Sequence, residues 1–140
     1  MRPSGNLGNA VSTRIRPAAV AGLFYPGDAT ELRDAVSEYL SQAPTGARPV
    51  PKALIVPHAG YIYSGRIAGA AYSQVVHRRK QIRRIVLIGP SHRVYLRGMA
   101  VPSAEGFQSP LGMVPVDREL KARVLQHEPV LQSDAPHGDR

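Results

Sequence analysis

Two histidines, His58 and His92, are the residues whose type and spacing best suit metal chemistry in this 140-residue sequence. Each follows a short apolar run that a proline ends, Pro57 in the first case and Pro90 in the second. Proline cannot donate a hydrogen bond to a sheet ladder, so each run is expected to end as a strand at its proline. If the two strands are parallel neighbours ~4.8 Å apart, both imidazoles stand at one sheet edge and can reach one metal ion at ~2.1 Å.

The alternative is that each histidine lies on an ordinary surface loop, and the residues alone leave this open. A catalytic zinc or iron ion usually takes three protein ligands and keeps an open position. The other histidines, His77, His127 and His137, offer no obvious third ligand. The sequence contains no Cys, which excludes a thiolate ligand, a thiol nucleophile and a disulfide within these residues. A metal bound here is therefore expected to be held by histidine and carboxylate side chains.

The elements expected to position the two histidines form a strand–helix–strand unit. Residues 53–56 and 85–88 are continuous apolar runs, which are typical of parallel strands that helices cover on both faces. A helix is predicted between them, starting at Ser64, because apolar side chains recur there on one face. Gly65 and Gly69 in its first turns would let this helix pack closely. The sequence therefore predicts an α/β fold with a mostly parallel sheet and flanking helices.

Two further helices are predicted from their N-terminal caps. Asp28 and Glu31 have the spacing of a capping box, and the apolar stripe behind them runs to about Ser41. Asp117 is the expected cap of a last helix, which should break near Pro129. These caps predict where two helices begin more sharply than where they end.

The rest of the chain predicts a single domain with a loose beginning. Residues 1–15 lack hydrophobic periodicity and are expected to form a flexible tail, and residues 16–140 are expected to form the domain. Residues 44–51 are rich in proline and predict a linker. Residues 99–101 and 113–116 are weaker strand candidates.

The charge balance first suggests nucleic-acid binding, because the formal net charge is +8 and residues 78–84 form a dense basic cluster. Aromatic side chains that could stack on bases make up only 6% of the chain and do not interleave with this cluster. A solvated helix end is therefore the favoured interpretation, and a nucleic-acid partner is not expected. The absence of a long apolar run or a secretory signal predicts a cytoplasmic protein with no membrane partner.

Four stretches of the sequence resemble the Memo family, whose bacterial and archaeal members are called AmmeMemoRadiSam system protein B. The two signature stretches are Pro57-His58-Ala59-Gly60-Tyr61-Ile62-Tyr63-Ser64-Gly65 and Leu87-Ile88-Gly89-Pro90-Ser91-His92. The other two are Ala21-Gly22-Leu23-Phe24-Tyr25-Pro26 and Phe107-Gln108-Ser109-Pro110-Leu111-Gly112. The resemblance implies a fold similar to class III extradiol dioxygenases, which use non-haem iron, and a metal pocket linked to iron or copper and to redox activity.

The resemblance also implies roles for individual residues. His58 and His92 match the first two histidines of the family's metal pocket. Phe24 and Tyr63 match aromatic residues that line it, and Ser91 adjoins it, so these three are the expected substrate-binding residues. An animal member of the family binds a phosphotyrosine peptide near the pocket. The expected ligand is therefore a small molecule or a peptide.

Full members of the family are nearly twice as long as this chain, so residues 16–140 resemble the N-terminal part of a Memo-like domain. The third pocket histidine and a pocket cysteine belong to the C-terminal half of full members. This predicts a truncated or frameshifted gene product, or a fragment, with poor stability or a tendency to self-associate. Three functions stay open: a metal-dependent oxidoreductase, a non-catalytic module that binds a peptide in the old pocket, and an inactive truncated product.

Overall fold

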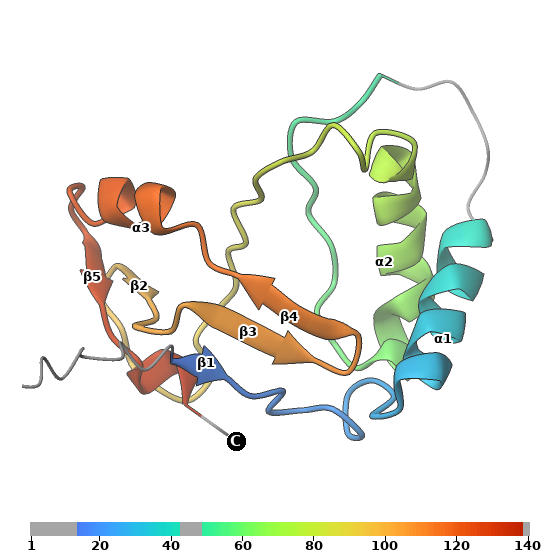
Figure 1. Ribbon diagram of the computed structural model, residues 1–140, viewed down its shortest axis with the longest axis horizontal. Helices are drawn as coiled ribbons and strands as arrows, with labels where there is room; N and C mark the ends of the chain where they lie inside the picture. Colours follow the sequence, from blue (N-terminus) through green and yellow to red (C-terminus); the bar gives the residue numbers. More distant parts are fainter. Residues whose placement is uncertain (1–13, 43–48, 139–140) are drawn as a thin grey trace, which may run out of the picture.

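The computed structural model describes residues 14–42 and 49–138, which form a helix pair beside two small sheets (Figure 1). The helices are α1 (Ala29–Ser41), α2 (Tyr61–Val76) and α3 (Arg118–Val124), and a 3-10 turn, η1, covers Ala135–His137. The strands are β1 (Ile15–Arg16), β2 (Met99–Val101), β3 (Gly106–Ser109), β4 (Gly112–Pro115) and β5 (Val130–Gln132). The predicted α/β class is confirmed.

Each sheet contains a parallel pair that joins segments far apart in the chain. In the three-stranded sheet, β1 runs parallel to β3, with Ile15 opposite Gly106, and β4 returns antiparallel to β3. Gly112 begins β4 with φ near 121°, a conformation that favours glycine, so the hairpin turns there. In the second sheet, β2 runs parallel to β5, with Met99 opposite Val130. The candidate strand at 99–101 is confirmed, and the one at 113–116 is confirmed as β4, shifted by one residue.

The helix pair is built from a capped start and a close approach. The Asp28 carboxylate accepts hydrogen bonds from the backbone N–H groups of Thr30 and Glu31 at 2.8 and 3.0 Å, which confirms Asp28 as the cap of α1. A Cβ added at Gly69 would lie 2.6 Å from the Tyr39 carbonyl oxygen, closer than real Cβ atoms come to such an oxygen. The prediction that glycine lets α2 pack closely is therefore confirmed. The Asp117 cap of α3 is confirmed as well, by a 2.9 Å bond from the Leu120 N–H group.

Helix α2 begins earlier than the sequence predicts, at Tyr61 instead of Ser64. Gly60 is its N-cap, and the Tyr61 N–H group donates to the Phe24 carbonyl oxygen at 2.8 Å. A partner outside the helix thus satisfies one of the free N–H groups of its first turn. The apolar periodicity could not show that the helix starts at Tyr61, because the supporting contact comes from Phe24, 37 positions earlier in the chain.

Residues 53–56 and 85–88 are called the first and second apolar segments. The prediction that they form strands is wrong for the described structure. Figure 1 draws both as irregular chain, the first running down to the start of α2 and the second running down again after α2 has returned upward. The path is that of a strand–helix–strand unit, but the described residues give these segments no sheet partner. A strand of a parallel sheet depends on neighbours for its hydrogen bonds, so an apolar run without them stays irregular.

Other expectations fall partly outside the described residues. The proposed flexible tail at 1–15 and the linker at 44–51 lie mostly beyond them and stay predictions. Within the two described ranges, no helix is both long enough and apolar enough to cross a bilayer.

Candidate metal site

The structure brings His58 and His92 together, although they are 34 residues apart in the chain. Their Nε2 atoms lie 3.1 Å apart, and their ring centroids lie 5.2 Å apart with the rings tilted by 47°. Both side chains are exposed. The two imidazoles therefore converge at the ends of the two apolar segments, even though those segments form no sheet.

The His58 turn is held by the start of α2 and by the segment around Phe24. Ser64, which is only 6% exposed, donates its hydroxyl proton to the Ala59 carbonyl oxygen at 2.8 Å. Gly60 is buried against Phe24, and a Cβ at Gly60 would lie 3.3 Å from the Phe24 carbonyl oxygen. These contacts fix the backbone on the C-terminal side of His58 without restraining its ring.

Tyr61 anchors this turn through a small aromatic cluster. Its ring lies 5.8 Å from that of Tyr25 and 5.9 Å from that of Tyr39, the latter edge-on. Burial raises the pKa of the Tyr61 phenol above its ordinary value, and the neighbouring tyrosines add to the shift. Tyr63, one position beyond Ile62, is 79% exposed instead. Of this alternating pair, Tyr61 packs and Tyr63 faces outward.

The loop that carries His92 is held differently. The Ser91 hydroxyl donates to the Val94 carbonyl oxygen at 2.6 Å, which closes a short turn around His92. The Ser91 proton is therefore committed within the loop, although its oxygen can still accept a hydrogen bond. Phe24 is 51% exposed and lies beside Gly60, two residues from His58. No described contact joins the side chain of Tyr63 or Ser91 to either imidazole, and their substrate-binding role stays a prediction.

The two imidazoles fit two positions of a metal ion's coordination shell. Two nitrogens that bind one ion at about 2.1 Å and at about 90–110° to each other lie about 3.0–3.4 Å apart. The observed 3.1 Å falls in this range, and it is also the length of an ordinary hydrogen bond between a neutral imidazole pair. Among the described residues, no group of three or more His, Cys, Asp or Glu side chains is placed to hold a metal ion. The donors present thus fit part of a site.

The remaining histidines lie elsewhere, as the sequence suggested. His77 ends α2, and His127 is exposed after α3. The His137 Nε2 atom lies 3.2 Å from the Ala100 carbonyl oxygen, so this ring packs against β2. None of the three joins the His58–His92 pair.

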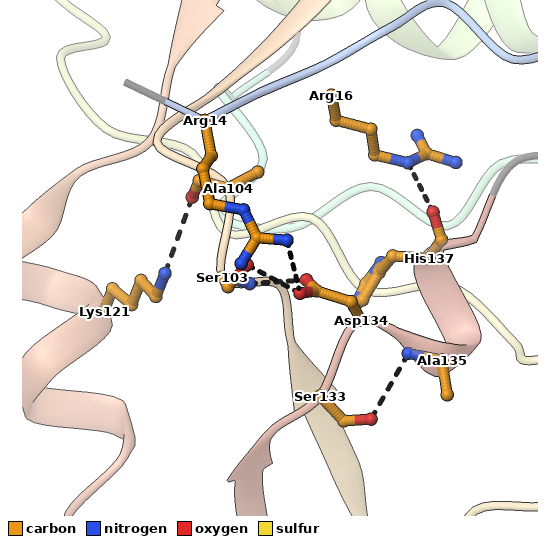
Figure 2. A network of polar contacts seen from close by, with 9 residues as sticks. All are labelled: Arg14, Arg16, Ser103, Ala104, Lys121, Ser133, Asp134, Ala135 and His137. Carbon is orange, nitrogen blue, oxygen red and sulfur yellow. Dashed lines mark hydrogen bonds and ion pairs between the residues drawn. The ribbon is translucent and has the colours of Figure 1, made fainter. Parts of the chain in front are cut away.

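Figure 2 shows a polar network near η1 that the sequence reasoning missed. Asp134 accepts hydrogen bonds from the Ser103 N–H group at 2.7 Å and from its hydroxyl at 2.6 Å, and it pairs with Arg14 at 3.5 Å. The Ser103 donors hold the pKa of Asp134 below its ordinary value. Arg16 donates to the His137 carbonyl oxygen at 2.7 Å. The network ties both ends of the described chain to the β2 region, which is a structural role.

The basic cluster at 78–84 is partly a structural feature as well. Arg84 pairs with Asp117 and with Glu119 at the start of α3, and the hydrogen bond that Arg84 donates to the Glu119 carboxylate contributes most to raising the Arg84 pKa. The chain entering the second apolar segment is thereby tied to α3. This use of Arg84 agrees with the interpretation that the cluster is not a nucleic-acid site, which stays a prediction.

The fold and the site define an α/β protein in which two exposed imidazoles meet at the ends of two apolar segments. The chain belongs to the Memo-like protein family, which it matches over residues 16–138. It is 38% identical to a MEMO1 family protein of Aquifex aeolicus over 114 residues, which are 81% of this chain and 41% of the relative.

Similar relatives occur in archaea and in animals. Identity to a MEMO1 family protein of Thermoplasma volcanium is 32% over 121 residues, or 86% of this chain and 44% of the relative. Identity to Protein MEMO1 of Xenopus laevis is 38% over 105 residues, or 75% of this chain and 34% of the relative. The chain thus spans less than half the length of these curated relatives.

Proposed function

We propose that this chain is a Memo-like protein in which His58 and His92 bind iron or copper. The observation that carries the proposal is the 3.1 Å separation of the two Nε2 atoms, which suits two ligands of one ion. Both histidines lie in the stretches that resemble the family's signatures. A metal bound there would supply Lewis-acid and redox chemistry of the kind used by extradiol dioxygenases, whose fold the resemblance to the Memo family implies.

The chain's own residues would prepare this site in two ways. Ser64 and Phe24 hold the backbone after His58, and the Ser91–Val94 turn holds the loop around His92. Phe24, which lies against Gly60 and is half exposed, would offer an apolar face to a ligand, and Ser91 keeps an acceptor oxygen next to His92 in the chain. The proposed reaction class is oxidation of a small molecule, and the cytoplasm is the proposed location.

Metal analysis of purified protein tests this proposal. After dialysis against Fe(II) or Cu(II) and removal of free metal, the unaltered chain should retain metal in a fixed ratio. The His58→Ala, His92→Ala double variant should lose it. The matched control is His77→Ala, His127→Ala, which removes two exposed histidines elsewhere and should retain the metal. Equal metal content in all three proteins would refute the proposal.

Exposed aromatic side chains favour a second candidate function, the capture of a peptide without catalysis. Phe24 is 51% and Tyr63 is 79% exposed, and the chain carries a net charge of +8 that would attract an acidic peptide. A phosphotyrosine peptide is the probe, titrated with and without a chelator. Binding that survives the chelator and weakens in Phe24→Ala supports this candidate. Binding that the chelator abolishes supports the metal proposal instead.

A further inference from the structure

The middle of the chain, residues 39–104, contains no acidic residue and is called the acid-free segment. It holds ten of the 18 Lys and Arg residues and none of the ten Asp and Glu residues. The net charge of +8 therefore originates in this segment, because the rest of the chain has more acids than cations. Both histidines of the candidate site, His58 and His92, lie within it.

The acids that flank this segment are engaged elsewhere. On one side, the Glu38 carboxylate accepts a hydrogen bond from the Gln42 side chain at 2.8 Å. On the other side, Glu105 forms an ion pair with Arg118 at 2.9 Å. Among the described residues, Arg84 is the one cation of the acid-free segment that forms ion pairs, and it forms them at the start of α3. The positive charge of the segment is therefore largely uncompensated.

The loop after His92 presents two of these cations beside the candidate site. Arg93, Tyr95 and Arg97 are exposed, Tyr95 at 91%, whereas the two aliphatic residues between them are half-buried. One side of the loop thus holds two guanidinium groups and a phenol in solvent. Arg93 directly follows His92 and lies in the turn that the Ser91 hydroxyl closes, so its charge belongs to the site.

Helix α2 presents a similar combination on the side of His58. Tyr63 is 79% exposed, and Arg66, three residues later, is also exposed. Residues three apart lie on one face of a helix. Both elements that hold the histidines therefore offer an aromatic ring close to a guanidinium. A ring of this kind contacts the apolar body of a ligand, and a guanidinium makes paired hydrogen bonds to a carboxylate or a phosphate.

We propose that the ligand of this site is a small organic anion, whose carboxylate or phosphate group binds Arg93 and Arg97. The neutral His58 and His92 imidazoles would not reduce the charge of a metal ion bound to them, so the loaded pair would attract an anion more strongly. The other cations of the acid-free segment raise the rate of encounter. The role of the anion as a substrate rests on the proposed oxidation at the histidine pair, whereas its binding does not need the metal.

The test is an NMR titration of the full chain without metal, so that failure of the metal proposal does not affect it. The probes are phenylacetate and 2-phenylethyl phosphate, each compared with a neutral counterpart, phenylacetamide or 2-phenylethanol. Amide signals of residues 91–97 should shift and saturate with the anions, and the neutral molecules should bind about tenfold more weakly or worse. Anion affinity should fall as salt rises from about 0.02 to about 0.3 M, because salt screens exposed charges.

Paired variants separate local recognition from general charge. The Arg93→Gln, Arg97→Gln double variant should weaken binding of both anions by about tenfold or more. The matched control, Arg79→Gln, Arg83→Gln, removes the same charge from the basic cluster at 78–84 and should change the affinity by less than about twofold at moderate salt. Helical circular dichroism checks that both variants keep the fold, and all four substituted side chains are exposed.

Four outcomes would overturn the proposal. They are the lack of saturable shifts at 91–97, equal binding of the anions and their neutral counterparts, equal losses in the two double variants, and a response to a tetraglutamate peptide but to neither small anion. The third would mean that net charge alone attracts the probes, and the fourth would assign the loop to a protein partner. Specific anion binding by a chain that retains no metal would support the anion site and refute the proposed oxidation.

Discussion

Substituting Gly69 with alanine tests the packing that positions the start of α2, and with it the His58 turn. A Cβ at this position would lie 2.6 Å from the carbonyl oxygen of Tyr39, 2.8 Å from its carbonyl carbon and 2.7 Å from its Cβ. These atoms belong to or adjoin the α1 backbone, so rotating a side chain cannot relieve the overlap. The two helices must move apart for the alanine to fit.

The expected loss follows from two opposing contributions. Alanine in place of glycine favours a helix interior by about 1 kcal/mol. Overpacking costs about 1–3 kcal/mol, and a backbone obstacle places Gly69→Ala at the upper end of that range. The net destabilisation is therefore about 1–2 kcal/mol. With a urea dependence of about 2 kcal/mol per molar, the unfolding midpoint should fall by about 0.5–1 M.

Gly65→Ala is the internal control. Its added Cβ would lie 2.6 Å from Cε2 and 2.7 Å from Cζ of the Tyr39 ring, which can swing aside more cheaply than a backbone. Overpacking near the lower end and the gain in helix propensity should almost cancel. Urea titrations followed by helical circular dichroism compare the two variants with the unaltered chain. A Gly69→Ala midpoint equal to or above that of the unaltered chain would refute the close approach of α1 and α2.

Three further predictions concern polar contacts. Stability should fall as the pH drops through the acidic range, because Asp28, Asp117 and Asp134 all have pKa values below those of the unfolded chain. Their contribution is present above the unfolded value of about 4 and is lost as each folded pKa is passed. Urea midpoints from neutral to acidic pH should show a shallower fall in Asp134→Ala, and an identical fall would contradict the assignment. Arg84→Ala should lower the midpoint more than Arg83→Ala, since Arg84 alone of the two pairs with Asp117 and Glu119; equal effects would remove the proposed tie to α3. Ser64→Ala should weaken metal binding by His58 and His92 while Ser73→Ala should not, because only Ser64 bonds the turn at Ala59; titration calorimetry with Cu(II) measures both.

Local signals in the sequence predicted the elements that depend on local contacts. Asp28 and Asp117 cap their helices because a carboxylate reaches N–H groups two or three residues ahead, which is a property of a short stretch of chain. The convergence of His58 and His92 was also visible, as two prolines and two histidines follow two similar apolar runs. The family's signature stretches gave the same pair.

Local sequence signals could not predict the pairing of strands that lie far apart in the chain. The strand β1 contains only Ile15 and Arg16 and exists because β3, about 90 residues later, supplies its hydrogen bonds. The 130–132 strand depends in the same way on β2. Conversely, residues 85–88 carry a strong strand signal and form no strand, because no described segment pairs with them. Strand formation depended on the partner more than on the propensity of the run.

The two imidazoles are therefore preorganised to different degrees. His58 stands next to a turn fixed by the buried Ser64 hydroxyl and by the backbone contact of Tyr61 with Phe24, and both contacts are made by the first turn of α2. His92 stands in a turn closed by Ser91, at the end of an exposed segment that no described strand supports. Most of the entropy lost on forming a metal site would come from ordering residues 85–92. His92, more than His58, is therefore the imidazole whose loop a bound metal would have to order.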